Sequence, residues 1–170
     1  MASFTSDVKG LRTFEAIQLV KNESVWIGVG KEQPWDSSET VPLVAYDSTM
    51  LETIGYKRAD QLTLVVPDEA GTIHQMNQTW RAVDVDEGKA LNARWVYVQG
   101  WLNYDQFVLK TFRQTGVWAG LQPKDNVLPN QQVVYPEDVA DPGYLLVLNN
   151  RSAITREANQ KESIDFIIEF

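Results

Sequence analysis

Hydrophobic residues recur along the first part of the chain at two different spacings. In residues 6–21 they recur every three positions, as Val8, Leu11, Phe14 and Ile17. This spacing predicts a helix with one apolar face, and Ser6 or Asp7 is expected to cap its first turn. The next run, residues 24–30, is short, continuous and rich in β-branched residues. It predicts a central strand covered on both faces.

Polar and proline-bearing positions interrupt the apolar pattern after this strand. Residues 31–46 contain two prolines and a Ser-Ser pair, so they are expected to form a loop. Residues 47–58 carry Thr49 and Glu52 at capping-box spacing ahead of a glycine, which predicts a short helix. Residues 61–67 then return to a strand pattern that ends at a proline.

Aromatic and β-branched residues dominate the rest of the chain and favour strands. The predicted strands cover residues 72–84, 93–104, 105–121, 144–150 and 163–170. Residues 122–143 contain four prolines and are expected to form an extended loop. Because strands occur in runs and do not alternate with long helices, the pattern predicts an α+β, β-rich domain. Its layers would be those of a sheet or sandwich, with one or two short helices in the N-terminal half.

Length and composition bound the class of protein. The chain has 170 residues, of which 44% are hydrophobic and 22% charged, which fits one globular domain. No apolar run approaches the roughly 18 residues of a membrane span, and the N-terminal residues lack the basic-then-apolar build of a signal peptide. We therefore expect a protein that is kept in a cytoplasm and does not cross a membrane.

Residue types exclude several kinds of site. The absence of Cys rules out disulfides and thiolate sites, and the single histidine, His74, cannot form a multi-histidine metal site. The formal net charge of −8 disfavours nucleic acid as a partner, because phosphate contacts need clustered Lys and Arg. No metal and no other cofactor are expected.

The glycine pair Gly28 and Gly30 raises the question of a phosphate site. A dinucleotide-binding fingerprint requires a third glycine and a helix that opens at once, but Gln33 and Pro34 stand there. A phosphate-binding P-loop requires Ser or Thr after Gly-Lys, and Glu32 occupies that position. We interpret the pair as strand glycines that let a neighbouring backbone approach closely.

Acidic residues cluster in one short stretch, at Asp84, Asp86 and Glu87. A glycosidase needs two carboxylates set across a cleft, whereas adjacent acids before a glycine are typical of a solvated turn. His74 has no Gly-x-Ser-x-Gly nucleophile elbow to serve, so it is interpreted as a structural or surface residue. A cell-wall-cleaving glycosidase that uses Asp84 and Asp86 stays open as a second alternative function.

Aromatic residues are plentiful, with six Trp, six Tyr and six Phe. Core packing accounts for many of them. Four tryptophans are interleaved with polar residues, namely Trp35, Trp80, Trp101 and Trp118. This pattern suits stacking on sugars or anchoring a protein interface. A carbohydrate- or receptor-binding β-module is therefore the first alternative function.

Two segments, in the same order along the chain, resemble one known family. In the first, Gly30, Lys31, Pro34, Trp35 and Ser37 form a Gly-basic-x-x-Pro-Trp-x-Ser loop after an apolar strand. In the second, the matching residues are Gly143, Tyr144, Asn150, Arg151, Gln160, Glu162, Ile164 and Phe170. Together these segments resemble the baseplate wedge proteins that gene eight encodes in T-even-type contractile-tailed phages.

The resemblance implies a structural protein of the virion, part of the baseplate wedge of a contractile tail, assembled in the host cytoplasm and without enzymatic activity. It implies a homodimer within each wedge and contacts with other wedge proteins. Because the family is longer, this chain is expected to be a shortened version that forms a single domain over residues 1–170. Residues 1–67 and 143–170 would form the framing core, and residues 68–142 a β-rich insertion.

Two regions are expected to make the contacts of such a protein. They are the loop 31–46, with Trp35 as its anchor, and the proline-rich segment 122–143. The predicted interface residues are Lys31, Pro34, Trp35, Asp36, Ser37, Pro129, Tyr135 and Arg151. No catalytic, cofactor-binding or metal-binding residue is predicted.

Overall fold

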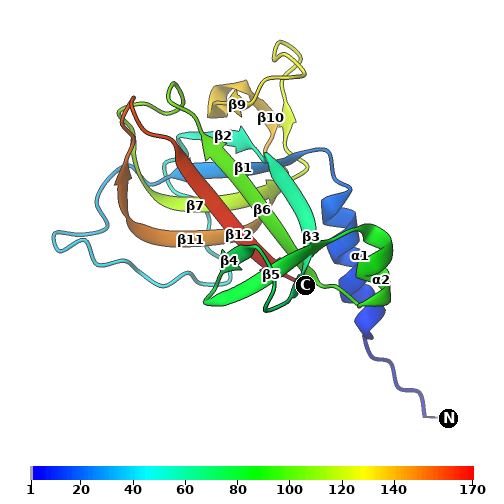
Figure 1. Cartoon of the computed structure of the whole chain (residues 1–170). Coiled ribbons are helices and arrows are strands. Elements are labelled where there is room, and N and C mark those ends of the chain that lie inside the picture. The colour runs from blue at the N-terminus through cyan, green and yellow to red at the C-terminus, as the bar shows by residue number, and fades with distance from the viewer. Residues whose placement is uncertain (1) are drawn as a thin grey trace. The chain divides into compact units, whose positions relative to one another are not determined.

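The computed structural model describes residues 2–170 and is rich in strands (Figure 1). In chain order its helices and longer strands are α1 (Lys9–Val20), β1 (Val25–Gly30), β2 (Gly55–Arg58), β3 (Gln61–Pro67), β4 (Ile73–Gln75), β5 (Gln78–Val83), α2 (Val85–Ala90), β6 (Trp95–Leu102), β7 (Thr111–Ala119), β11 (Tyr144–Thr155) and β12 (Glu162–Glu169). Between β7 and β11 lie the short elements β8 (Gln122–Pro123), β9 (Val133–Val134), η1 (Pro136–Asp138) and β10 (Val139–Asp141). The layered, β-rich α+β class predicted from the sequence is confirmed.

The chain forms two compact units. Unit 1 contains residues 2–21, 61–98 and 165–170, and unit 2 contains residues 22–60 and 99–164. The resemblance implied a different division, namely a single domain with a framing core over residues 1–67 and 143–170 and an insertion over 68–142. That division stays a prediction.

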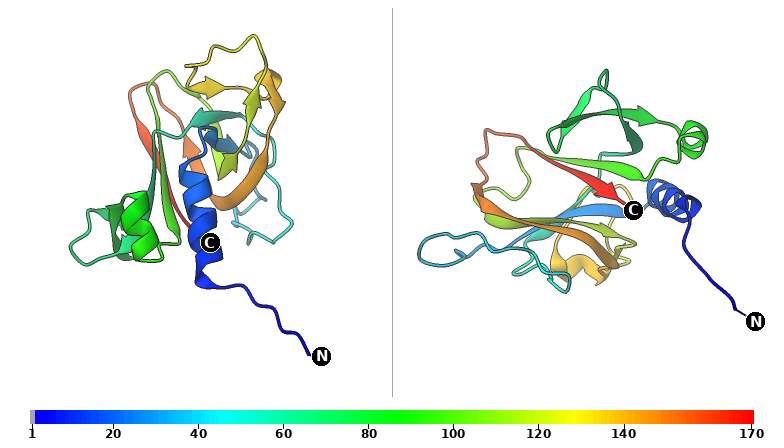
Figure 2. Two further views of the ribbon diagram at one scale, coloured as in Figure 1. Left: turned by 90° about the vertical axis from the view of Figure 1, so that its right-hand side faces the viewer. Right: turned by 90° about the horizontal axis from the view of Figure 1, so that it is seen from below.

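Unit 1 contains β3, β4 and β5 with the first part of β6 and the last part of β12, which are strands of a sheet in the order β12-β6-β3-β5-β4. Its core cluster consists of Val65, Trp80 and Tyr97, with Ile73, Trp95 and Ile167 packed against it. Helix α1 contacts β3 and α2, and Figure 2 shows the two helices near each other. Since Trp95 and Tyr97 pack on one face of β6 while Val96 and Val98 are buried on the other, the expected two-sided burial of this strand is confirmed.

Helix α1 differs from its prediction in where it begins and in which face it buries. It begins at Lys9 after Val8, with no side-chain cap, so the predicted cap by Ser6 or Asp7 is wrong. Its buried residues are Thr13, Ala16, Ile17 and Leu19, whereas Val8, Leu11 and Phe14 are exposed. The buried face of α1 is determined by its contact with β3. Of the four residues predicted to form the apolar face, only Ile17 lies on it.

Two further segments of unit 1 were only partly predicted. Residues 72–84 form a hairpin, because Met76 and Asn77 both have φ of 56° and reverse the chain between β4 and β5. Such a two-residue turn matches the twist of an antiparallel pair. The acidic stretch expected to be a turn is the short helix α2, and its cap is Asp84, whose carboxylate accepts a hydrogen bond from the Glu87 amide.

Unit 2 is built on a sheet in the order β11-β7-β1-β2-β9. All six residues of the central strand β1 are buried, as predicted. Gly28 lies opposite Gly116 on β7, and a Cβ at Gly28 would come within 2.4 Å of the Trp118 ring. A Cβ at Gly30 would come within 2.6 Å of the Leu51 carbonyl oxygen, so Gly30 lets a neighbouring backbone approach, as interpreted from the sequence. Gly28 instead makes room for a side chain, which differs from that interpretation. The core cluster of this unit contains Trp26, Tyr56, Trp118, Leu121 and Val134.

Several boundaries in unit 2 differ from their predictions. The helix predicted over 47–58 is wrong: its end forms β2, and the amide of Ile54 donates to the carbonyl of Val29. These backbone groups pair with β1 and are not available to a helix. Strand β7 begins at Thr111, later than predicted, and β11 continues to Thr155.

Candidate functional site

Residues 31–49, called the clasped loop here, are held against β7 by a buried arginine. Arg113 is 6% exposed. Its guanidinium donates to the carbonyl of Glu32 and to both carboxylate oxygens of Glu39, with Nε 2.9 Å from Oε2. A buried guanidinium needs such partners, so these bonds fix the position of the loop.

A chain of hydrogen bonds between amide groups fixes the loop at a second point. Gln114 on β7 accepts a hydrogen bond from the Leu51 amide at 2.7 Å and donates to the Asn150 side chain at 2.8 Å. Asn150 on β11 in turn donates to the carbonyl of Pro42 at 3.0 Å. The clasped loop is therefore tied to two neighbouring strands of one sheet.

Trp35 ties the same loop to the edge strand. Its indole N–H donates to the carbonyl of Arg151 at 3.0 Å, and the Lys31 ammonium lies 5.8 Å from its ring centroid. Lys31 also forms an ion pair with Glu52 at 3.4 Å. Three of the predicted interface residues are thus brought together, and burial lowers the pKa of Arg151.

Two carboxylates of the clasped loop, and Glu52 just beyond it, are stabilised in their charged form. Hydrogen bonds from the Thr40 amide and the Ser38 hydroxyl lower the pKa of Asp36. The hydrogen bond from Arg113 lowers the pKa of Glu39, and the Gln33 amide lowers that of Glu52. At neutral pH the loop therefore depends on charge-assisted bonds.

The remaining predicted interface residues fall into two groups. Pro34, Asp36 and Ser37 are exposed on the clasped loop near Trp35. The exposed residues Pro129 and Tyr135 contact other parts of unit 2: the Pro129 carbonyl accepts from Arg58 at 3.5 Å, and the Tyr135 ring packs edge-to-face on Phe107. The sequence predicted these exposed surfaces, and their use as interfaces stays a prediction.

A groove that the sequence did not predict lies between the clasped loop and β11. Its volume is about 560 Å³, and it is lined by Val44, Ala45, Tyr46, Ser48, Thr49 and Leu145, Leu146, Val147, Leu148. None of these side chains is charged. Tyr46 and the neighbouring Leu43 are fully exposed to solvent. The signal in the sequence is the apolar run 43–46 inside a segment that otherwise reads as a polar loop.

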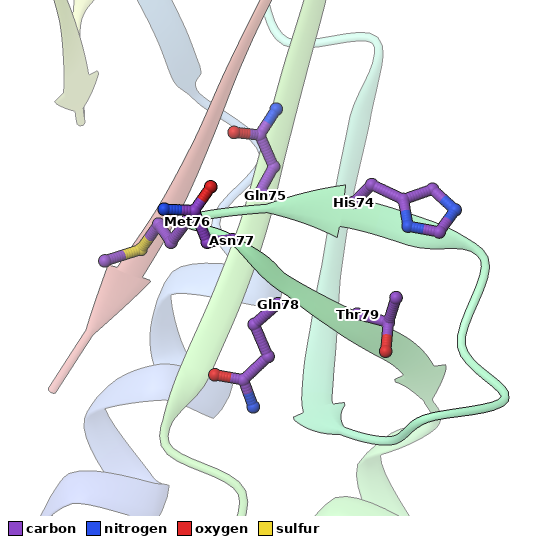
Figure 3. A pocket seen from close by; sticks show the side chains of 6 residues that line it. All are labelled: His74, Gln75, Met76, Asn77, Gln78 and Thr79. Carbon is purple, nitrogen blue, oxygen red and sulfur yellow. The ribbon is translucent and has the colours of Figure 1, made fainter.

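The other candidates from the sequence are distributed differently. Trp80 and Trp118 are core residues, while Trp101 is 42% exposed. His74 lies on the β4–β5 hairpin, beside a hollow of about 650 Å³. Figure 3 shows that the six side chains around this hollow point in different directions, so they do not converge on a ligand.

Among residues 2–170 no group of three or more His, Cys, Asp or Glu side chains is placed to hold a metal ion. No helix in this part of the chain is both long enough and apolar enough to cross a membrane.

Comparison with known proteins identifies the family. A family model described as "Baseplate wedge 3 tail fiber network component" matches residues 1–170. The chain belongs to this family. It is also 27% identical over 165 residues to "Virion protein 3" of Enterococcus phage phiEF24C, an alignment that covers 92% of this chain and 90% of that protein.

Membership of the baseplate wedge family confirms the structural phage-tail role predicted from the sequence. It also confirms that the resemblance of residues 30–42 and 143–170 pointed to a wedge protein. The match supports a baseplate wedge protein but not the gene-eight family in particular, so that assignment stays a prediction.

Proposed function

We propose that this wedge protein joins its neighbours through the clasped loop, with Trp35 as anchor, and through the segment 122–143. The observation that carries the proposal is the attachment of the loop to β7 by Arg113 and to β11 by Asn150. A loop that is fixed before binding loses little conformational entropy when a partner docks on it. Other baseplate wedge proteins are its proposed partners.

Four finer statements belong to the same proposal. The chain is a shortened version of the gene-eight wedge protein, it forms a homodimer within each wedge, it is assembled in the host cytoplasm, and it is not an enzyme. The resemblance described above supports the first three statements, and the structural family supports the fourth. In addition, Asp84, one of the two carboxylates considered for a glycosidase, is engaged in capping α2.

Phage particles that carry Trp35 variants test the proposed anchor. Trp35→Ala removes the apolar surface and should leave the chain out of assembled baseplates. Trp35→Phe keeps an aromatic surface but loses the bond to Arg151, so it should assemble at least partly. Trp101→Ala, at an exposed tryptophan of the same unit, is the matched control. Normal baseplates with Trp35→Ala, together with a purified chain that is strictly monomeric, would refute the proposal.

A carbohydrate- or receptor-binding module is the second candidate function, and one observation favours it. Trp101 lines a hollow of about 380 Å³ together with Asp60, Asn103 and Lys161, and an exposed indole beside polar groups is suited to sugar stacking. Calorimetry against bacterial cell-wall saccharides tests it. A heat of binding that disappears in Trp101→Ala would favour this function.

A further inference from the structure

We infer that two copies of this chain pair edge to edge through residues 145–148 of β11. The inference deepens the proposed homodimer and rests on it, because it names the surface that the two copies share.

The edges of the two five-stranded sheets formed by residues 2–170 differ in how they are protected. Edge strands invite pairing with another chain unless they are short, bulged or covered, or carry charges or proline. Strands β9 and β4 have two and three residues. Strand β12 carries Glu162, Asp165 and Glu169. Strand β11 is twelve residues long, and its first seven residues, Tyr144–Asn150, include no charge and no proline. Apart from a bulge at Leu146 and the clasped loop beside it, this stretch carries none of these protections.

The clasped loop covers only part of this edge. It bonds to the Arg151 carbonyl through Trp35 and to the Asn150 side chain through Pro42. No hydrogen bond recorded for residues 2–170 joins the loop to the backbone of 145–148. One residue of this stretch, Leu146, lies at a bulge in the pairing with β7, and the register is continuous from Val147 to Asn150. A free edge therefore remains beside the groove.

The groove defines the chemistry of its occupant. Its nine lining residues carry no charge, so a charged segment would lose hydration there without finding a counter-charge. The edge backbone offers donors and acceptors that an extended strand satisfies. The occupant is therefore an extended, uncharged, apolar strand.

A second copy of the chain supplies such a strand. The segment Tyr144–Leu148 is itself extended, uncharged and apolar, and Tyr144 and Leu146 are 78% and 38% exposed. Two identical strands related by a two-fold axis pair antiparallel, so each copy contributes the same edge and assembly stops at two. Standard interfaces bury roughly 1,200–2,000 Å² in total. The strands alone would not reach this area, so the exposed Leu43 and Tyr46 are expected to be buried as well.

Sedimentation equilibrium of the purified full-length chain tests the inference. The wild type should shift from the 19.3 kDa chain mass toward twice that mass as its concentration rises to about 100 μM. Leu146→Lys places a positive charge on both copies at the paired strands. It should weaken dimerisation and raise the dissociation constant at least about 10-fold. Leu109→Lys, at a leucine that is 79% exposed in the same unit, makes the same charge change and should dimerise like the wild type. Circular dichroism shows whether both variants fold.

Hydrogen exchange locates the contact directly. The amides of residues 145–148 should exchange more slowly at high than at low protein concentration, and Leu146→Lys should abolish the difference. A chain that stays monomeric, equal effects of the two lysine variants, or protection confined to another surface would each overturn the inference. A monomeric chain that still enters baseplates in a Trp35-dependent way would leave the proposed anchor intact, so the two failures are distinguishable.

Discussion

Gly28 lies where β1 passes the indole ring of Trp118, at a distance that leaves no room for a methyl group. Gly28→Ala should therefore destabilise the fold by about 1–3 kcal/mol through overpacking. Gly10→Ala is the matched control, because nothing lies within 4 Å of that position in α1. It should stabilise the helix by about 0.5–1 kcal/mol. Urea unfolding measures both, and an equal effect of the two substitutions would contradict the packing argument.

Glu39 makes the stability of the clasped loop depend on pH. The hydrogen bond from Arg113 lowers its pKa from the ordinary value of 4.5, so its contribution to stability is present above that value. The contribution is lost as the pH falls through the lowered pKa. Glu39→Gln should therefore be less stable than the wild type at pH 7, and the difference should shrink as the pH falls below the ordinary value of 4.5 and through the lowered pKa.

Urea unfolding midpoints at neutral and acid pH measure this difference. Glu69→Gln, at an exposed carboxylate of unit 1, controls for the change in net charge. If the Glu39 and Glu69 variants shift the midpoint equally at every pH, the ion pair with Arg113 does not stabilise the loop.

At the scale of single elements, α2 depends on its cap. The Asp84 carboxylate accepts from the Glu87 amide at 2.8 Å, and loss of such a cap costs about 0.5–2 kcal/mol. Asp84→Ala should lower the free energy of unfolding by that amount, whereas Asp84→Asn and Asp86→Ala should have smaller effects. Thermal unfolding distinguishes the three. A larger effect of Asp86→Ala would mean that the cap is not the main role of this acidic stretch.

The elements differ in how far local sequence determines them. Strand β1 was predicted because a continuous apolar run of six residues has few solutions other than a central strand. The helix predicted over 47–58 failed because its backbone groups pair with β1, which local propensity does not register. The turn between β4 and β5 was missed because Met76 and Asn77 are not a typical hairpin turn pair.

At the scale of the whole molecule, net charge opposes self-association. Each copy carries a formal charge of −8, so two copies repel over a Debye length that shrinks from about 30 Å at 0.01 M salt to about 10 Å at 0.1 M. Salt should therefore strengthen the proposed dimer, whose seam is uncharged. Sedimentation equilibrium across this range measures the dissociation constant. If salt weakens the dimer, opposite charges hold it together, and the uncharged edge of β11 is not the contact.

The sequence by itself determined the β-rich class, the position of the central strand and the exclusion of a phosphate site at Gly28 and Gly30. All of these follow from short, contiguous patterns, and the resemblance of two segments to a known family pointed to a wedge protein. Only the tertiary structure decided which face α1 buries, that Arg113 and Asn150 clasp the loop, and that 145–148 lie at an uncharged sheet edge. These features depend on contacts between residues far apart in the chain, such as Asn150 with Pro42, and a local pattern does not specify its distant partner.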